Sequence, residues 1–242
     1  MRTIFLLIFT ALTLLADHLT VAAAANVSYA MEELARAFEK SHPDTHVRIV
    51  VGSSGKLTAQ IRHGAPYDLF LSADLNYPQS LYTEGRGMWP PQVYAKGGLV
   101  LLSSKPRNLS KGLATLLSPD IRRIAVANPR TAPYGRAARE ALQNAGIYAK
   151  VAPRLIYGEN ISQTLAYTLK AADAGLVARS SLFAPSLRRF KKGRNWVAVD
   201  PALYHPIRQG ILLLRPDGEA FYRFILAPAG QAILRRYGYL QP

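Results

Sequence analysis

The sequence predicts an α/β protein with mostly parallel sheets, because short apolar segments alternate with amphipathic ones along its 242 residues. The short segments have the length of buried strands, whereas the amphipathic segments repeat apolar residues at helical spacing. The length suits one large domain or two lobes of about 100 residues each. No internal repeat or low-complexity tract competes with this interpretation.

The predicted strands and helices alternate in chain order. Strands are expected at 19–23, 47–51, 69–72, 99–103, 124–127, 155–157, 175–177 and 211–214. Helices are expected to begin near Ser28, Lys56, Gly135, Ile161 and Asp217. Apolar positions 31, 34, 35 and 38 give the first helix one buried face, and positions 138, 142 and 145 do the same for the third. The last helix should run from 217 to about 237 with a break at Pro228.

Loops of small residues join several strands to the helices that follow. The run Ala-Ala-Ala-Ala-Asn-Val-Ser at 22–28 is one such loop, and Gly-Ser-Ser-Gly at 52–55 is another. Small side chains let a ligand approach the backbone, and a helix start offers unpaired N–H groups that attract anions. The loops at 128–135 and 158–161 lead into two further helix starts, and two prolines fix Tyr134 just ahead of one of them. Together these loops predict a receptor for an oxyanion.

Two segments are expected to connect two lobes. One lies at 94–98, where paired glycines precede an apolar strand, and the other is the proline-bounded stretch at 200–206. If both cross the same gap, the first lobe comprises 17–96 plus 201–242, and the second comprises 97–200. Such a topology makes a hinged cleft, which is a favoured place for ligands.

Residues 1–16 are predicted to be an export signal. Arg2 precedes an apolar run at 4–15, and Ala16 is a small residue before the expected cleavage point. The run is short for a membrane span, and an uncleaved anchor is the alternative. The chain has no cysteine, which excludes disulfides, thiolate metal sites, cysteine nucleophiles and a lipid-bearing cysteine. The mature protein is therefore expected to work outside the cytoplasm, in the periplasm.

The chain is strongly basic, with a formal net charge of +15. Such a balance raises the local concentration of anions, whether small ions, lipid headgroups or nucleic acid. The basic residues are dispersed, with modest clusters at 122–123, 188–192 and 235–236, and they do not alternate with aromatic residues as in single-strand-binding proteins. Solvated surface charge is the favoured interpretation, and an exported protein that binds polyanions or membrane surfaces is a third class of function.

Several stretches in chain order resemble the family of periplasmic molybdate-binding proteins of ATP-binding-cassette importers. They lie at 23–26, 53–55, 64–74, 128–135, 158–161, 175–177 and 236–238, and Gly-Ala-Pro-Tyr-Asp-Leu-Phe-Leu-Ser-Ala-Asp at 64–74 is the most specific. The resemblance covers the expected mature chain. It implies a two-lobed type II periplasmic solute-binding fold that closes around molybdate or tungstate. It also implies a monomer without a cofactor, which delivers its ligand to a membrane permease and its ATPase.

The resemblance also implies a set of ligand-binding residues: Asn26, Ser54, Tyr134, Ile161 and Ala178. In this family neutral donors hold the anion, so Ser54 should donate from its backbone and hydroxyl, and Tyr134 and Ile161 from their backbone N–H groups. Asn26 stands where relatives often carry serine. Ala178 stands where relatives often carry a tyrosine whose hydroxyl reaches the anion, and the Tyr134 hydroxyl is the hypothetical substitute.

Other functions are weighed on the same residues. A receptor for another oxyanion, such as sulfate, is the nearest alternative, since sequence does not give the size of a cavity. Phosphate is disfavoured, because a protonated ligand would need an acceptor in the site. An enzyme is disfavoured, because the histidines make no HExxH spacing and no GxSxG or P-loop motif occurs.

Overall fold

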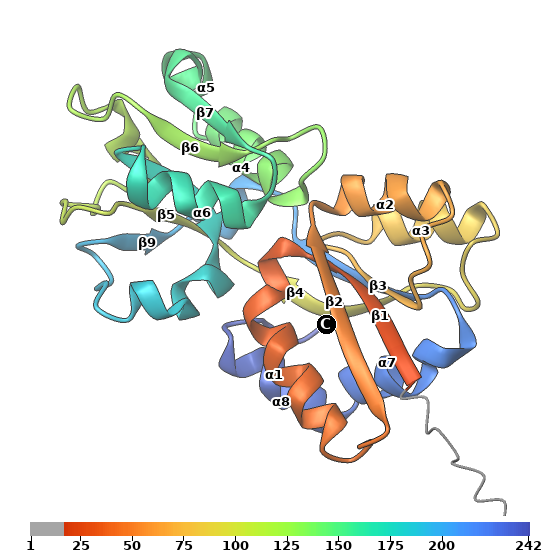
Figure 1. The fold of residues 1–242 in the computed structure, drawn as a ribbon. Coiled ribbons are helices and arrows are strands. Elements are labelled where there is room, and N and C mark those ends of the chain that lie inside the picture. Colours follow the sequence, from red (N-terminus) through yellow and green to blue (C-terminus); the bar gives the residue numbers. More distant parts are fainter. Residues whose placement is uncertain (1–16) are drawn as a thin grey trace, which may run out of the picture.

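Two five-stranded sheets, each covered by helices on both faces, lie side by side as two lobes (Figure 1). The structure is a computed structural model that describes residues 17–242. The predicted export signal at 1–16 lies outside the described residues. The two-lobed α/β fold predicted from the sequence is confirmed.

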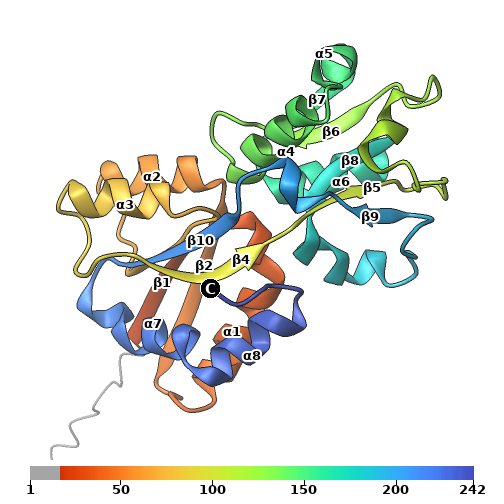
Figure 2. The ribbon, with the colours of Figure 1, turned by 180° about the vertical axis from the view of Figure 1, so that it is seen from behind.

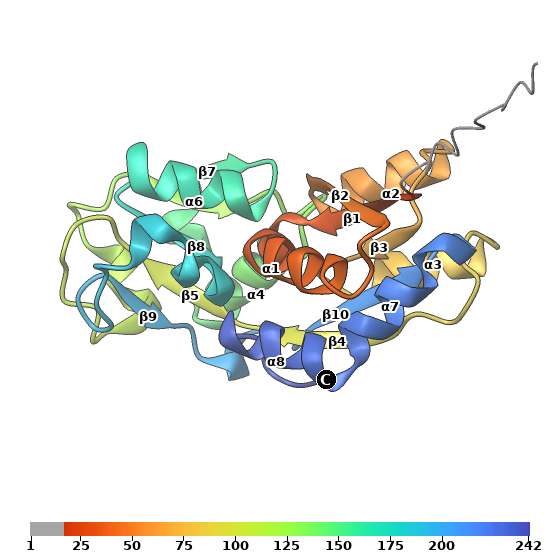
Figure 3. The ribbon, with the colours of Figure 1, turned by 60° about the horizontal axis from the view of Figure 1, so that its bottom comes forward.

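The first lobe is built on the sheet β2-β1-β3-β10-β4. Its strands are β1 (Asp17–Ala24), β2 (Thr45–Gly52), β3 (Leu69–Leu71), β4 (Gln92–Gly97) and β10 (Ile207–Leu213). Its helices are α1 (Ser28–Glu39), α2 (Ser54–Arg62), α3 (Asn76–Thr83), α7 (Glu219–Leu226) and α8 (Pro228–Arg236). Val21 and Ala23 pack toward α1, α7 and α8, whereas Ala22 packs toward α2 and α3 (Figures 1 and 3).

The second lobe repeats this arrangement on the sheet β7-β6-β8-β5-β9. Its strands are β5 (Leu99–Leu102), β6 (Ile124–Ala127), β7 (Leu155–Gly158), β8 (Ala174–Ala178) and β9 (Trp196–Ala198). Its helices are α4 (Pro133–Asn144), α5 (Tyr148–Val151) and α6 (Ile161–Lys170). Leu101 and Leu176 pack with α4 residues, whereas Val100 and Val177 pack with Leu165 of α6.

The sheets are mostly parallel, as expected, and each contains one strand that runs against the other four. In the first sheet β10 runs antiparallel to both of its neighbours, β3 and β4. In the second sheet β5 runs antiparallel to both of its neighbours, β8 and β9. The reason lies in the connections: β5 and β10 are the strands that the chain enters on crossing from the other lobe, so each runs against the strands of its own sheet.

The chain crosses between the lobes twice, and the two connections run beside each other (Figure 2). The first is the Gly97-Gly98 pair between β4 and β5, and the second follows β9 and leads into β10 at Ile207. They are held together by pairing of Ile207 with Gly97 and by a bond of 3.1 Å from Leu99 N to the Tyr204 hydroxyl. The lobe boundaries expected at 96/97 and 200/201 stay a prediction.

The stretch at 64–74 joins the strands of the first lobe. Asp68 Oδ2 accepts the backbone N–H of Thr20 at 2.7 Å, and the Asp68 carbonyl accepts the N–H of Leu214 at 2.9 Å. Gly64 has a φ of +83°, a conformation that favours glycine. This segment therefore fixes β1, β3 and β10 relative to one another. It also places Ser72 and Ala73 directly after the end of β3.

Candidate oxyanion-binding site

A small cavity lies between the lobes, where five loops meet. Its volume is about 10 Å³. Sites for drug-sized molecules span roughly 300–1,000 Å³, so this one suits a much smaller ligand. Every lining residue is uncharged; they are Ala24, Ala25, Asn26, Gly52, Ser53, Ser54 and Ala73 of the first lobe, and Ala132, Pro133, Tyr134, Asn160 and Ile161 of the second.

Asn26 reaches the cavity from the turn between β1 and α1. The strand ends at Ala24, and a 3-10 turn over Ala25–Val27 precedes the first residue of α1, Ser28. Small alanines form this part of the wall, which leaves the Asn26 amide as its polar group. The Asn26 side chain is 3% exposed, and its Nδ2 donates to Gln209 Oε1 at 2.8 Å.

Ser54 is the first residue of α2 and is 1% exposed. Its neighbour Ser53 caps the helix, because the Ser53 hydroxyl oxygen accepts the Lys56 N–H at 3.4 Å. The Ser54 hydroxyl oxygen accepts the Ala73 N–H at 2.9 Å. That bond uses a lone pair of the oxygen and leaves its proton available as a donor to a ligand.

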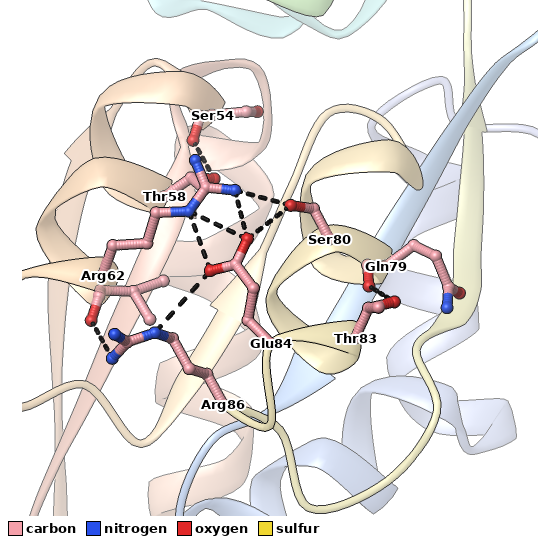
Figure 4. A network of polar contacts seen from close by, with 9 residues as sticks. Ser54, Thr58, Arg62, Gln79, Ser80, Thr83, Glu84 and Arg86 are labelled. Atoms are coloured by element: carbon pink, nitrogen blue, oxygen red, sulfur yellow. Dashed lines mark hydrogen bonds and ion pairs between the residues drawn. The ribbon is translucent and has the colours of Figure 1, made fainter.

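Helix α2, which carries Ser54, is anchored to α3 by a network of polar contacts (Figure 4). Glu84 accepts the Arg62 Nε–H at 3.0 Å and the Ser80 hydroxyl at 2.9 Å, and it pairs with Arg86 at 3.8 Å. Hydrogen bonds from Arg62 and then Ser80 lower the pKa of Glu84 to about 2. Within α2, the Thr58 hydroxyl donates to the Ser54 carbonyl at 2.8 Å. These contacts hold the helix that carries Ser54.

Two helix starts approach the cavity from the second lobe. Pro133 is the first residue of α4 and has no N–H, so Tyr134 provides the first backbone donor of that helix. Asn160 caps α6 by accepting the Gln163 N–H at 3.0 Å, and Ile161 begins the helix. First-turn N–H groups have no acceptor within their own helix, and the helix dipole makes such positions favourable for an anion.

The structure brings together four of the five residues named from the sequence. Asn26, Ser54, Tyr134 and Ile161 line the same cavity, two from each lobe. Ala178 is not among the lining residues; it ends β8, is fully buried and pairs with Leu99 of β5. Its methyl side chain has no hydrogen-bond donor.

The Tyr134 hydroxyl lies at the strand crossing. It accepts the Gln209 Nε2–H at 3.3 Å, and a side chain at Gly97 would overlap it, since a Cβ there would stand 2.2 Å from the phenol oxygen. Burial raises the pKa of Tyr134 well above its ordinary value, with smaller effects from Tyr239 and Tyr204. The phenol therefore stays protonated and neutral at physiological pH.

Direct contacts join the lobes around the cavity. Gly55 N–H donates to the Thr131 carbonyl at 2.9 Å, and the Ser162 hydroxyl donates to the Ala25 carbonyl at 3.0 Å. A Cβ at Gly55 would stand 3.0 Å from the Thr131 oxygen and 2.7 Å from the Tyr77 hydroxyl, so the glycine permits this close approach. Lys56 pairs with Glu159 at 2.9 Å and Arg136 pairs with Asp74, and both ion pairs cross between the lobes.

Sequence reasoning did not single out every residue that forms the cavity. Ala73 lines it and binds the Ser54 hydroxyl, although only its place in the stretch at 64–74 marked it. Gln209 contacts Asn26 and Tyr134 but lies on β10, distant in the chain from either one. No local pattern marks such a residue, because a lone glutamine in an apolar strand has no characteristic neighbours.

Among residues 17–242, no group of three or more His, Asp or Glu side chains could hold a metal ion. No helix in this range has both the length and the apolar character that a bilayer crossing requires.

Two lobes with a cavity between them and paired crossings define a class, the two-lobed solute-binding proteins. The pattern of the family described as bacterial extracellular solute-binding protein matches residues 19–240, and the chain belongs to this family. The molybdate-binding protein ModA of Rhodobacter capsulatus is 34% identical over 95% of this chain and 91% of its own length. The molybdate-binding protein ModA of Azotobacter vinelandii is 33% identical over 93% of this chain and 90% of its own length. The structure of the Azotobacter vinelandii periplasmic molybdate-binding protein superposes with a TM-score of 0.85 at 32% identity, covering 93% of this chain and 99% of that one.

Proposed function

We propose that this protein is an extracytoplasmic receptor that captures molybdate, and also tungstate, in the cavity between its lobes. The observation that carries the proposal is the convergence of the neutral donors of Ser54, Tyr134 and Ile161 on one small cavity whose lining has no charged residue. The likeness to molybdate-binding proteins at 33–34% identity along almost the whole chain supports the same ligand.

The donor chemistry supports a fully deprotonated anion. Molybdate, tungstate and sulfate carry no proton near neutral pH, so every oxygen accepts hydrogen bonds. The Ser54 hydroxyl and the first-turn N–H groups of Tyr134 and Ile161 are donors. A protonated anion such as hydrogen phosphate brings a donor of its own, which would be left unsatisfied among them at a cost of about 1–3 kcal/mol. The absence of a carboxylate from the lining therefore favours fully deprotonated anions.

The proposed role is transport rather than catalysis. A ligand can shift the lobes toward the closed arrangement only if it binds that arrangement better, and donors contributed by both lobes meet this condition. We place the protein in the periplasm as a monomer, where the closed form docks on a membrane permease with a cytoplasmic ATPase. The oxyanion is then cargo, and no resident cofactor is needed.

The experiment is calorimetric titration of the mature protein with molybdate, tungstate, sulfate and phosphate. We expect one-to-one binding of molybdate and tungstate, with sulfate and phosphate much weaker. A preference for sulfate would keep the site and change the cargo. No binding of any of the four would refute the proposal, and binding that is unsaturable and abolished by salt would favour a polyanion-binding surface instead.

A further inference from the structure

A buried network of amide and phenol groups adjoins the cavity. Its members are Asn26, Tyr94, Tyr134, Gln209 and Tyr239, each 5% exposed or less. Gln209 Oε1 accepts from Asn26 Nδ2 and from the Tyr94 hydroxyl, both at 2.8 Å, and Gln209 Nε2 donates to the Tyr134 hydroxyl at 3.3 Å. Asn26 Nδ2 also donates to the Tyr239 hydroxyl at 2.9 Å. Gln209 thus stands between Asn26 of one lobe and Tyr134 of the other.

One atom of this network has no partner. Among residues 17–242, the buried side-chain atoms without a hydrogen bond are Asn26 Oδ1, Thr115 Oγ1 and Tyr222 Oη, and of these residues only Asn26 lines the cavity. Both Nδ2 hydrogens of Asn26 are used by Gln209 and Tyr239, which do not line it. The Asn26 amide therefore uses its donor, Nδ2, inside the network, and its acceptor, Oδ1, is the atom that remains for a ligand. That is the wrong chemistry for a deprotonated anion.

Turning the Asn26 amide by 180° exchanges its oxygen and nitrogen. Nδ2 then becomes a donor for the cavity, but Oδ1 meets Gln209 Oε1, and two acceptors face each other. The conflict disappears only if the Gln209 amide turns as well. Gln209 Nε2 then donates to Asn26 Oδ1 and to the Tyr94 oxygen, while Gln209 Oε1 accepts from the Tyr134 hydroxyl. The Tyr239 hydroxyl, which donates to the Asn26 carbonyl at 2.7 Å, then donates to Asn26 Oδ1 instead, and the carbonyl keeps the Ser180 hydroxyl as its donor at 2.8 Å.

The phenols remain protonated in both arrangements. Burial raises the pKa values of Tyr94 and Tyr239 as it does that of Tyr134. The network is consequently neutral, and its two arrangements differ in the direction of the hydrogen bonds and not in charge. Because the Asn26 and Gln209 amides must turn together, the arrangement that suits a deprotonated anion is the turned one, in which Gln209 Nε2 holds Asn26 Oδ1 and Asn26 Nδ2 is directed to the cavity.

We infer that Gln209 is a positioning residue that sets the orientation of the Asn26 amide and thereby the preference of the cavity for fully deprotonated over protonated oxyanions. This inference rests on the proposed function. With Nδ2 toward the cavity, Asn26 adds a donor to those of Ser54, Tyr134 and Ile161, which suits a fully deprotonated oxyanion. With Oδ1 toward the cavity it offers an acceptor, which suits the proton of hydrogen phosphate.

The test is a double-mutant cycle with Gln209→Met and Asn26→Ala, read as the Kd for molybdate and for phosphate. Wild-type binding of molybdate first establishes the proposed function independently; without it, that function fails before the cycle begins. We expect Gln209→Met to raise the molybdate Kd roughly tenfold and to narrow the preference for molybdate over phosphate. In the Asn26→Ala background the same substitution should change the Kd less than about threefold. Equal effects in both backgrounds, or no effect in either, would overturn the inference.

A matched control and a second variant guard against trivial outcomes. Gln231→Met makes the same substitution in the same lobe, where Gln231 Nε2 donates to the carbonyls of Tyr94 and Ile225, and it should leave both Kd values unchanged. If Gln209→Met does not fold, Tyr94→Phe removes a single hydroxyl from Gln209 Oε1, and its effect on the Kd should likewise vanish with Asn26→Ala. An effect of Tyr94→Phe that persists there would contradict the inference.

Discussion

Ser54→Ala tests the contribution of one neutral donor to the site. The Ser54 hydroxyl oxygen accepts the Ala73 N–H at 2.9 Å, so its proton is the atom that the ligand would use. A hydrogen bond to a charged group contributes about 1.5–3 kcal/mol, and each 1.4 kcal/mol is about tenfold in affinity. We therefore expect the Kd for molybdate to rise roughly 10- to 150-fold, measured by calorimetry.

The control for this prediction is Ser28→Ala. Ser28 lies two residues after Asn26, which lines the cavity, but Ser28 itself does not line it. The Ser28 hydroxyl donates to the Ala25 carbonyl at 3.0 Å. Ser54→Ala also leaves the buried Ala73 N–H without a partner, so the unfolding temperature of both variants is measured separately from the Kd. If Ser54→Ala binds molybdate within threefold of the wild type, the donor reasoning is wrong.

Further predictions concern closure, pH and the phenol. Gly55→Val should raise the Kd for molybdate about 5- to 150-fold, because the added side chain would hold the lobes apart at Thr131. Small-angle scattering with molybdate should show a less compact protein than the wild type. Unchanged scattering and an unchanged Kd would contradict this prediction. Glu84→Gln tests a carboxylate with a lowered pKa: its stabilisation is present above the ordinary value of 4.5 and is lost as pH falls toward about 2. The difference in unfolding temperature between wild type and Glu84→Gln should accordingly be clear at pH 6 and shrink near pH 3, and a constant difference would argue against the ion pair. Tyr134→Phe should raise the Kd less than Ser54→Ala does, because the phenol is bonded to Gln209; an equal or larger loss would place the phenol on the anion.

Local sequence patterns were sufficient to predict the bounds of strands and helices whose apolar residues follow a simple spacing. The strand at 124–127 and the helix starts at Ser28 and Ile161 have the predicted bounds, because a buried run or a helical face lies within the segment itself. The break at Pro228 separates α7 from α8 as expected. β9 was not predicted, because three residues after a basic stretch carry little periodicity, and β4 was taken for a connection because of its paired glycines. α3 was missed as well, since Pro78 and polar residues interrupt its apolar face.

Some residues of the candidate site could be predicted from local sequence, and others depend on contacts between distant segments. Ser54 and Ile161 are visible in the sequence because each belongs to a loop that ends at a helix start. Gln209 is not, because its importance depends on β10 passing between Asn26 and Tyr134, and this arises only when the second crossing returns the chain to the first lobe. Antiparallel placement of β10 depends on the same crossing. Such relations are properties of the topology and cannot be obtained from any one segment.

The most direct measurement for the central claim is an anomalous difference map at the molybdenum absorption edge, from crystals of the protein grown with molybdate. We predict one strong peak, in the cavity between Asn26 and Ser54 of the first lobe and Tyr134 and Ile161 of the second. A peak confined to a basic surface segment such as 188–192, or no peak at all, would contradict the claim that neutral donors of this cavity hold the anion.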